Sequence, residues 1–207
     1  MKSIRKIGIV LFLLPSCAAL AAEPSGSPKV REVLKQAEAL MQAGRHAEAL
    51  DLARQALSSG PERKKDRVKA RVVLCQAKNA LNVPFQEPAS PGEDRCAPRD
   101  PEEGIRLASG ASVPAGKEVA RPEKLFGRVP RVPEEVRSST KRGVSVVSTV
   151  IDEEGCVRDV RVCEGDSEAF NQAARESFRG WVFEPATLDG TPVAVYYKLT
   201  AKLSVYP

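Results

Sequence analysis

Histidine and aromatic residues are scarce in this chain of 207 residues, which has one histidine, one tryptophan and 5% aromatic side chains. His46 lies among residues with a helical pattern and is expected to pack, and no serine lies in a nucleophile-elbow sequence. No glycine-rich loop precedes a helix, as a phosphate site requires. No stretch alternates basic and aromatic residues, as a groove for single-stranded nucleic acid does. The sequence therefore predicts neither an enzyme nor a nucleic-acid-binding protein, and it indicates no cofactor.

Patterns of metal ligands are missing as well. The cysteines and the single histidine do not form the close pairs that zinc sites use. The acidic run Asp152-Glu153-Glu154 comes directly before Gly155, and this composition is typical of a turn between strands. We therefore predict no metal site.

The five cysteines suit an oxidising compartment. Cys156 and Cys163 lie seven positions apart on one expected strand, which places their Cα atoms about 23 Å apart. That separation is far beyond disulfide reach, so these two cysteines cannot pair while the strand is intact. We expect a bridge between Cys75 and Cys96, although the sequence alone does not determine the connectivity.

An apolar run over residues 7–14 is too short to span a bilayer comfortably as a helix. The formal net charge is +5, and three of the positive charges precede this run, at Lys2, Arg5 and Lys6. The rest of the chain is therefore nearly balanced, and its basic character does not indicate nucleic acid. Pro15 ends the run, and Ala19-Leu20-Ala21 supplies small residues for cleavage. This arrangement predicts a signal peptide over residues 1–21.

Two alternatives to cleavage stay open at this segment. Leu14-Pro15-Ser16-Cys17 resembles a lipobox, which would lipidate Cys17, and an uncleaved signal would act as an anchor. Each alternative would attach the protein to a membrane. All three possibilities export the rest of the chain.

Residues 27–82 are predicted to form a small helical unit. Ser27 and Pro28 suit the start of a helix, and apolar residues then recur at helical spacing. Gly44 and Gly60-Pro61 separate this helix from a second and a third. The run over residues 44–50 resembles a tetratricopeptide repeat. One and a half repeats are fewer than such arrays usually need, so the unit is either a spacer or a surface that docks a partner.

Residues 83–120 are rich in proline and lack both periodicities, so we interpret them as a linker. Residues 121–207 are predicted to form a separate domain. Two β-rich runs, 144–152 and 156–163, flank the acidic turn, and a helical segment and a last alternating run follow. The order β-β-α-β indicates a two-layer α+β fold, with one antiparallel sheet and a helix on one face.

The facing of two strands can be read from their alternation. In the last strand Val193, Val195, Tyr197 and Leu199 share one side, which predicts a half-buried strand. The first strand is ambiguous, because its even positions are more apolar than its odd positions. The residues of this strand alone therefore leave open which set faces the core. Aromatic residues expected in this core are Phe170, Phe178, Trp181 and Phe183.

The sequence of this domain resembles the carboxy-terminal domain of the TonB family. Residues 150–162 are similar to the first hairpin of that domain, and Trp181, Phe183 and Pro185 with Gly190 and Pro192 are similar to a later block. Residues 121–125 and 132–137 resemble the segment that precedes the hairpin. The likeness covers about the last third to two-fifths of the chain. The family's register implies that the odd positions of the first strand, which include Ile151, face the core.

The resemblance implies a periplasmic protein that binds a short peptide of an outer-membrane TonB-dependent transporter, or of another envelope protein, by strand addition. An edge strand has unpaired main-chain groups that can accept such a strand. The residues that would bind the partner are Val193, Ala194, Val195, Tyr196, Tyr197, Lys198, Leu199, Thr200 and Lys202. Tyr196, Lys198 and Thr200 would give specificity through outward side chains.

The chain also departs from the family pattern. The family's energy transducers have a spanning helix with a histidine, and the short run over residues 7–14 has none. A role in TonB-dependent transport therefore stands beside an alternative. In that alternative the protein is a periplasmic scaffold that acts through its helical repeat and has no transport role.

Overall fold

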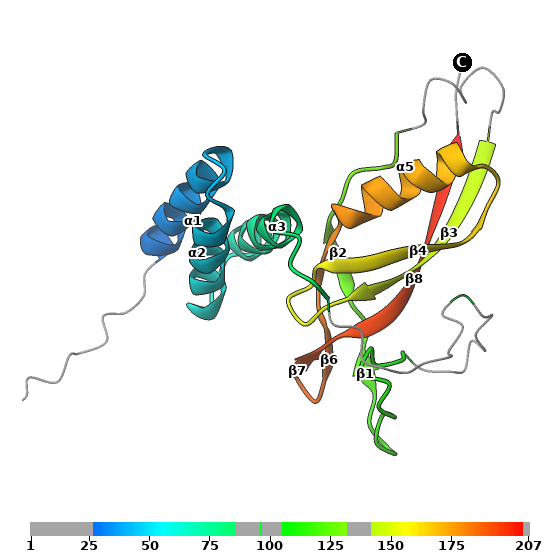
Figure 1. Cartoon of the computed structure of the whole chain (residues 1–207). Helices are drawn as coiled ribbons and strands as arrows, with labels where there is room; N and C mark the ends of the chain where they lie inside the picture. Colours follow the sequence, from blue (N-terminus) through cyan, green and yellow to red (C-terminus); the bar gives the residue numbers. More distant parts are fainter. Residues whose placement is uncertain (1–26, 86–95, 97–104, 132–141, 205–207) are drawn as a thin grey trace, which may run out of the picture.

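The computed structural model describes residues 27–85, 96, 105–131 and 142–204 (Figure 1). The predicted signal segment, with Cys17, lies outside these residues. The helices and strands are α1 (Ser27–Gln42), α2 (His46–Ser58), α3 (Lys64–Ala80), β1 (Val119–Ala120), β2 (Glu123–Phe126), β3 (Arg142–Ile151), β4 (Val157–Gly165), α5 (Glu168–Arg179), β5 (Val182–Glu184), β6 (Ala186–Leu188), β7 (Thr191–Val193) and β8 (Val195–Ser204). The predicted α+β class is confirmed.

The first three helices pack against one another as a small unit. Gly44 and Gly60 stand in the two connections with φ of 74° and 64°, which glycine adopts without the steric cost of a side chain. Small residues lie where the helices meet, and the buried alanines are Ala37, Ala49, Ala53, Ala56, Ala70 and Ala77. The alanines let the helices approach closely, while Leu34 and Leu74 supply the larger buried side chains.

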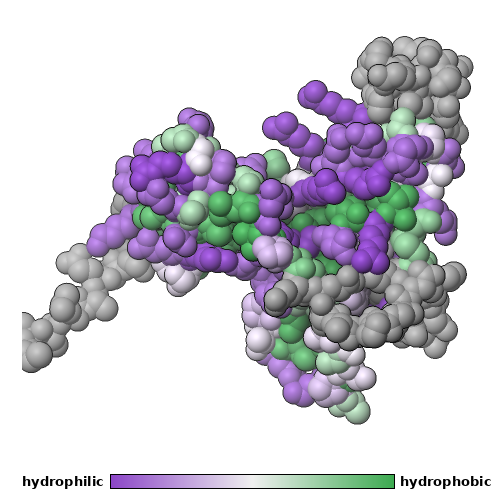
Figure 2. Space-filling model, in the orientation of Figure 1, coloured by the Kyte–Doolittle hydropathy of each residue, from purple (hydrophilic) through white to green (hydrophobic). Residues whose placement is uncertain are grey.

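The main sheet has the strand order β4-β3-β8 and is antiparallel throughout. Helix α5 lies along one face of it (Figure 1). Ser167 caps α5, because its side chain accepts a hydrogen bond from the backbone N–H of Phe170. On the face seen in Figure 2, apolar residues lie beneath α5 and within the helical unit, and hydrophilic residues surround them.

The odd positions of β3 face α5, as predicted. Val147 and Ile151 are fully buried with Phe178 of α5 in the main core. The polar members of this face are satisfied by hydrogen bonds: the Ser145 hydroxyl donates to Asn171 at 2.9 Å, and the Thr149 hydroxyl donates to a main-chain carbonyl at 2.6 Å. The more polar face of the strand can therefore point inward.

The even positions of β3 are apolar because a second layer covers part of the other face. Val150 is fully buried and packs with Ala108 and Tyr196, and Phe85 packs against the same cluster. Ala108 and Phe85 belong to the proline-rich stretch that the composition marks as a linker. At least these described parts of the stretch therefore pack on the domain.

Two small sheets complete the domain. One has the order β1-β6-β7, and the other pairs β2 with β5. Gly155, in the turn after β3, has φ of 86°, and a Cβ there would lie 2.0 Å from the carbonyl oxygen of Phe183. The N–H of Phe183 donates to the carbonyl of Gly155 at 2.8 Å. The hairpin turn can approach β5 this closely only because residue 155 is glycine.

The predicted Cys75–Cys96 disulfide is wrong. The bridges are Cys75–Cys156 and Cys96–Cys163, with Cα–Cα distances of 5.3 and 5.1 Å. Cys75 reaches Cys156 because α3 docks on the first hairpin, and Cys96 lies beside Cys163 of β4. Cys156 and Cys163 do not pair with each other, in agreement with the strand geometry.

Candidate functional site

The last strand, β8, lies at one edge of the main sheet and pairs with β3 over its whole length. Its inward residues follow the predicted alternation, since Val195, Leu199 and Ala201 are buried in the core beneath α5. Val193 does not belong to this strand, because it lies in β7 and pairs with Ala186. The predicted binding run therefore spans two elements.

The beginning of the outer edge of β8 is occupied by the chain itself. Leu107 forms an antiparallel bridge with Val195. The N–H of Ala108 donates to the carbonyl of Ala194 at 2.8 Å, and the N–H of Tyr196 donates to the carbonyl of Arg106 at 2.9 Å. A partner strand cannot use this part of the edge unless it displaces residues 106–108.

Tyr196 is not an outward specificity residue, which corrects the prediction. Its side chain is only 6% exposed and packs with Ala108 and Val150. The guanidinium of Arg106 lies 5.8 Å from the centre of its ring. Tyr196 faces away from α5 as expected, but residues 106–108 cover that face here.

After Tyr196, residues 106–108 no longer occupy the outer edge of β8. The outward N–H of Tyr196, together with the twofold alternation of an antiparallel strand, places the main-chain groups of Thr200 and Lys202 on the side away from β3. Among the described residues, none forms a strand pair with the outer side of this part of β8, the side away from β3. The side chains of Thr200 and Lys202 are exposed, while the Lys198 ammonium donates to the carbonyl of Cys96 at 3.0 Å. The candidate edge is therefore shorter than the sequence indicated.

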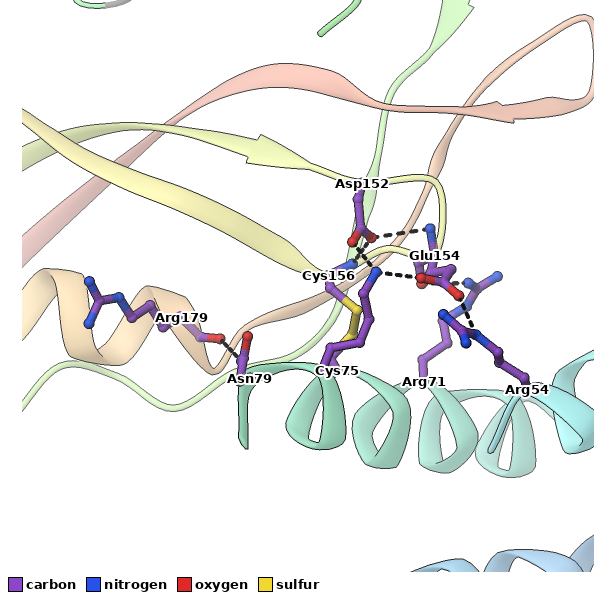
Figure 3. Close-up of a disulfide and its surroundings, with 9 residues drawn as sticks. Arg54, Arg71, Cys75, Asn79, Asp152, Glu154, Cys156 and Arg179 are labelled. Atoms are coloured by element: carbon purple, nitrogen blue, oxygen red, sulfur yellow. Dashed lines mark hydrogen bonds and ion pairs between the residues drawn. A yellow bond between two sulfur atoms is a disulfide. The ribbon is translucent and has the colours of Figure 1, made fainter. Parts of the chain in front are cut away.

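The second candidate site is the acidic hairpin turn at residues 152–154, against which helix α3 packs (Figure 3). The Lys78 ammonium lies 2.5 Å from Asp152 and also contacts Glu154. Arg71 donates to the carbonyl of Glu154 at 2.9 Å, and Arg54 donates to the Glu154 carboxylate at 3.0 Å. The Cys75–Cys156 disulfide lies beside these contacts. Together they hold the helical unit on the domain.

Sequence reasoning missed this junction, because it assigned the acidic run to a plain turn. One signal was available: Lys78 falls at helical spacing from Ala70, Leu74 and Ala77, on the buried face of α3. A lysine on an apolar face needs an acidic partner, since an unpaired buried charge is costly. The pattern could have predicted a partner but not its position in the chain.

The turn also perturbs an ionisable group. Burial alone would raise the pKa of Glu154, but hydrogen bonds and charge from Lys78 and Arg54 outweigh it and lower the pKa. Glu154 therefore carries its negative charge across the neutral range.

Among the residues that the structure describes, no cluster of histidine, cysteine, aspartate or glutamate could hold a metal ion.

Trp181 and Phe183 both lie in the aromatic core, but to different depths. Phe183 is 2% exposed, whereas Trp181 is half-buried. The Trp181 indole N–H donates to the carbonyl of Arg128 at 2.9 Å, and the Lys124 ammonium lies 3.1 Å from the centre of its ring. Burial lowers the pKa of Lys124. Through its hydrogen bond to Arg128, Trp181 holds the segment after β2 against the domain.

A two-layer α+β domain with an exposed edge strand presents main-chain groups that can pair with a strand of another protein. Residues 128–202 match the family model described as Gram-negative bacterial TonB protein C-terminal. This part of the chain, about a third of its length, is therefore a domain of the TonB C-terminal family, whose members mediate protein–protein interactions with envelope proteins.

A search of curated proteins found no match to the chain. Within the described parts of the chain, no helix has the length and apolar character needed to cross a membrane.

Proposed function

We propose that this is an exported periplasmic protein whose TonB domain binds an extended segment of a partner by strand addition to β8 beyond Tyr196. The partner is an outer-membrane TonB-dependent transporter or another envelope protein, and the binding serves transport across that membrane. The observation that carries the proposal is the outward main chain of Thr200 and Lys202, which the described part of the chain leaves available for pairing.

Two further observations support export and strand addition. All four described cysteines form disulfides, which persist in oxidising compartments such as the periplasm. The side chains of Thr200 and Lys202 are exposed on the face away from α5, where they would contact the added strand's side chains. Main-chain hydrogen bonds would supply affinity, and these side chains would supply selectivity.

The test uses a proline at the edge. Thr200→Pro removes an N–H that points away from β3, so the sheet loses no hydrogen bond of its own, and proline is tolerated at such edge positions. Thr200→Val is the matched control, because it keeps the main-chain donor. A proline at Tyr196 would be harder to interpret, because it would also remove the hydrogen bond from the Tyr196 N–H to the carbonyl of Arg106.

Binding of labelled peptides from transporter amino termini is measured by fluorescence anisotropy on the oxidised full chain. We expect Thr200→Pro to abolish saturable binding and Thr200→Val to retain it, with both variants keeping the wild-type circular dichroism spectrum. Equal binding by wild type and a folded Thr200→Pro protein would refute strand addition at this edge.

A further inference from the structure

A hollow of about 660 Å³ lies at the junction between the helical unit and the domain, lined by α1, α3 and the end of β2. Its volume falls in the range of pockets that hold ligands. The apolar residues that line it are Met41, Val68, Val72, Val73 and Phe126. Phe126 is 37% exposed, and a large apolar side chain that is exposed beside other apolar residues can mark an interaction site.

The hollow, which we call the junction groove, is a composite of the two units. Met41 and Val72 come from helices, whereas Phe126 comes from the domain. Their relative placement depends on the Cys75–Cys156 disulfide and on the ion pairs of the acidic turn. Because a covalent bond and buried charges hold the two walls, the groove is preformed, and a ligand would not have to pay for its assembly.

The charged residues that line the groove are mainly positive. Three lysines, Lys64, Lys65 and Lys69, line it with a single acid, Glu38. Lys69 pairs with Glu38 at 2.8 Å and Lys64 pairs with Glu123 at 3.3 Å, and both pairs are substantially exposed. None of the described residues forms an ion pair with Lys65. Exposed pairs of this kind contribute little, so an incoming carboxylate can replace Glu38 or Glu123 as a partner.

We propose that the junction groove binds a segment of a partner protein that carries a bulky aliphatic or aromatic side chain flanked by acidic residues. The apolar side chain would cover Val72 and Phe126, and the carboxylates would pair with the lysines at the rim. This site is separate from the β8 edge, so it does not depend on strand addition. It would let one partner, or two, bind both units of the chain.

The test begins with a random peptide library displayed on phage, selected at low salt on the oxidised full chain. Val72→Glu serves for counter-selection, because it places a carboxylate on the half-buried lining of the groove. The recovered peptides are then titrated against wild type, Lys65→Glu and Lys35→Glu. Lys35 is the matched control, since it is an exposed lysine of α1 that does not line the groove.

We expect the recovered peptides to combine acidic and bulky apolar residues. Lys65→Glu should weaken their binding about tenfold, because it converts an attraction into a repulsion, while Lys35→Glu should leave it unchanged. High salt should weaken binding as well. Thr200→Pro should have no effect, which separates this site from the β8 edge.

Four outcomes would overturn the proposal. Peptides that lack acidic residues, or that bind Val72→Glu as tightly as wild type, would show that the groove is not their site. Binding of the lysines to anionic lipid vesicles in preference to the peptides would assign the surface to a membrane. Self-association of the chain that Val72→Glu abolishes would assign it to a second copy.

Discussion

Replacement of Lys78 by methionine tests whether the acidic turn joins the two units. The Lys78 side chain is 9% exposed, and its ammonium lies 2.5 Å from Asp152, whose side chain is 5% exposed. Methionine keeps the unbranched shape and the helix propensity of lysine. The substitution therefore removes one charge from a buried pair and changes little else in α3.

The size of the expected stability loss depends on which partners Asp152 and Glu154 keep when Lys78 is replaced. Removal of one partner from a buried ion pair costs about 3–5 kcal/mol, because the other charge stays buried. Asp152 keeps hydrogen bonds from the N–H groups of Cys156, at 2.8 Å, and Glu154, at 3.2 Å. Glu154 keeps Arg54 and is partly exposed, so it adds little. We therefore expect a loss near the lower limit, about 3 kcal/mol.

The assay is urea unfolding with the disulfides intact, on wild type, Lys78→Met, Asp152→Asn and the double variant. If the pair acts as a unit, the double variant should lose less than the sum of the single losses, by about 1 kcal/mol or more. Lys35→Met, on the exposed face of α1, should stay within about 0.5 kcal/mol of wild type. A Lys78→Met loss below about 1 kcal/mol, or additive losses, would refute the reasoning.

Two other predictions concern acid stability and the aromatic core. Because Lys78 and Arg54 outweigh burial and lower the pKa of Glu154 from its ordinary value of 4.5, this carboxylate stabilises the fold above that pH and the benefit is lost as pH falls through the folded pKa. Unfolding free energies measured at decreasing pH should therefore fall less steeply in Glu154→Gln than in wild type, and parallel slopes would contradict the shift. Phe183→Ala should cost about 3–5 kcal/mol in the same urea assay, and Trp181→Ala should cost less because the indole is half-buried. A larger loss at Trp181 than at Phe183 would contradict this ranking.

Local patterns determined much of the domain. The alternation from Val195 to Ala201 predicted the facing of β8, and it held because one side of that strand packs beneath α5. The Gly44 and Gly60 positions predicted the helix connections, because a positive φ favours glycine wherever it occurs. The block around Phe183 carried the family resemblance, and a family model matches the same part of the chain.

Contacts between distant segments could not be derived in this way. Cys75 and Cys156 are 81 positions apart, and Cys96 and Cys163 are 67 apart, so their pairing depends on how whole elements dock. The same holds for residues 106–108, whose pairing with β8 shortens the candidate edge. Low regularity in a proline-rich stretch says nothing about whether that stretch packs against a sheet.

The sequence by itself determined the main helices, the long strands and the inward face of β8, because these depend on neighbours a few positions apart. Only the tertiary structure decided which cysteines pair, which part of β8 remains open and where the junction groove lies. Those features arise when α3, Cys96 and residues 106–108 lie against the domain. Docking is governed by shape and charge across the fold, which no local pattern of residues encodes.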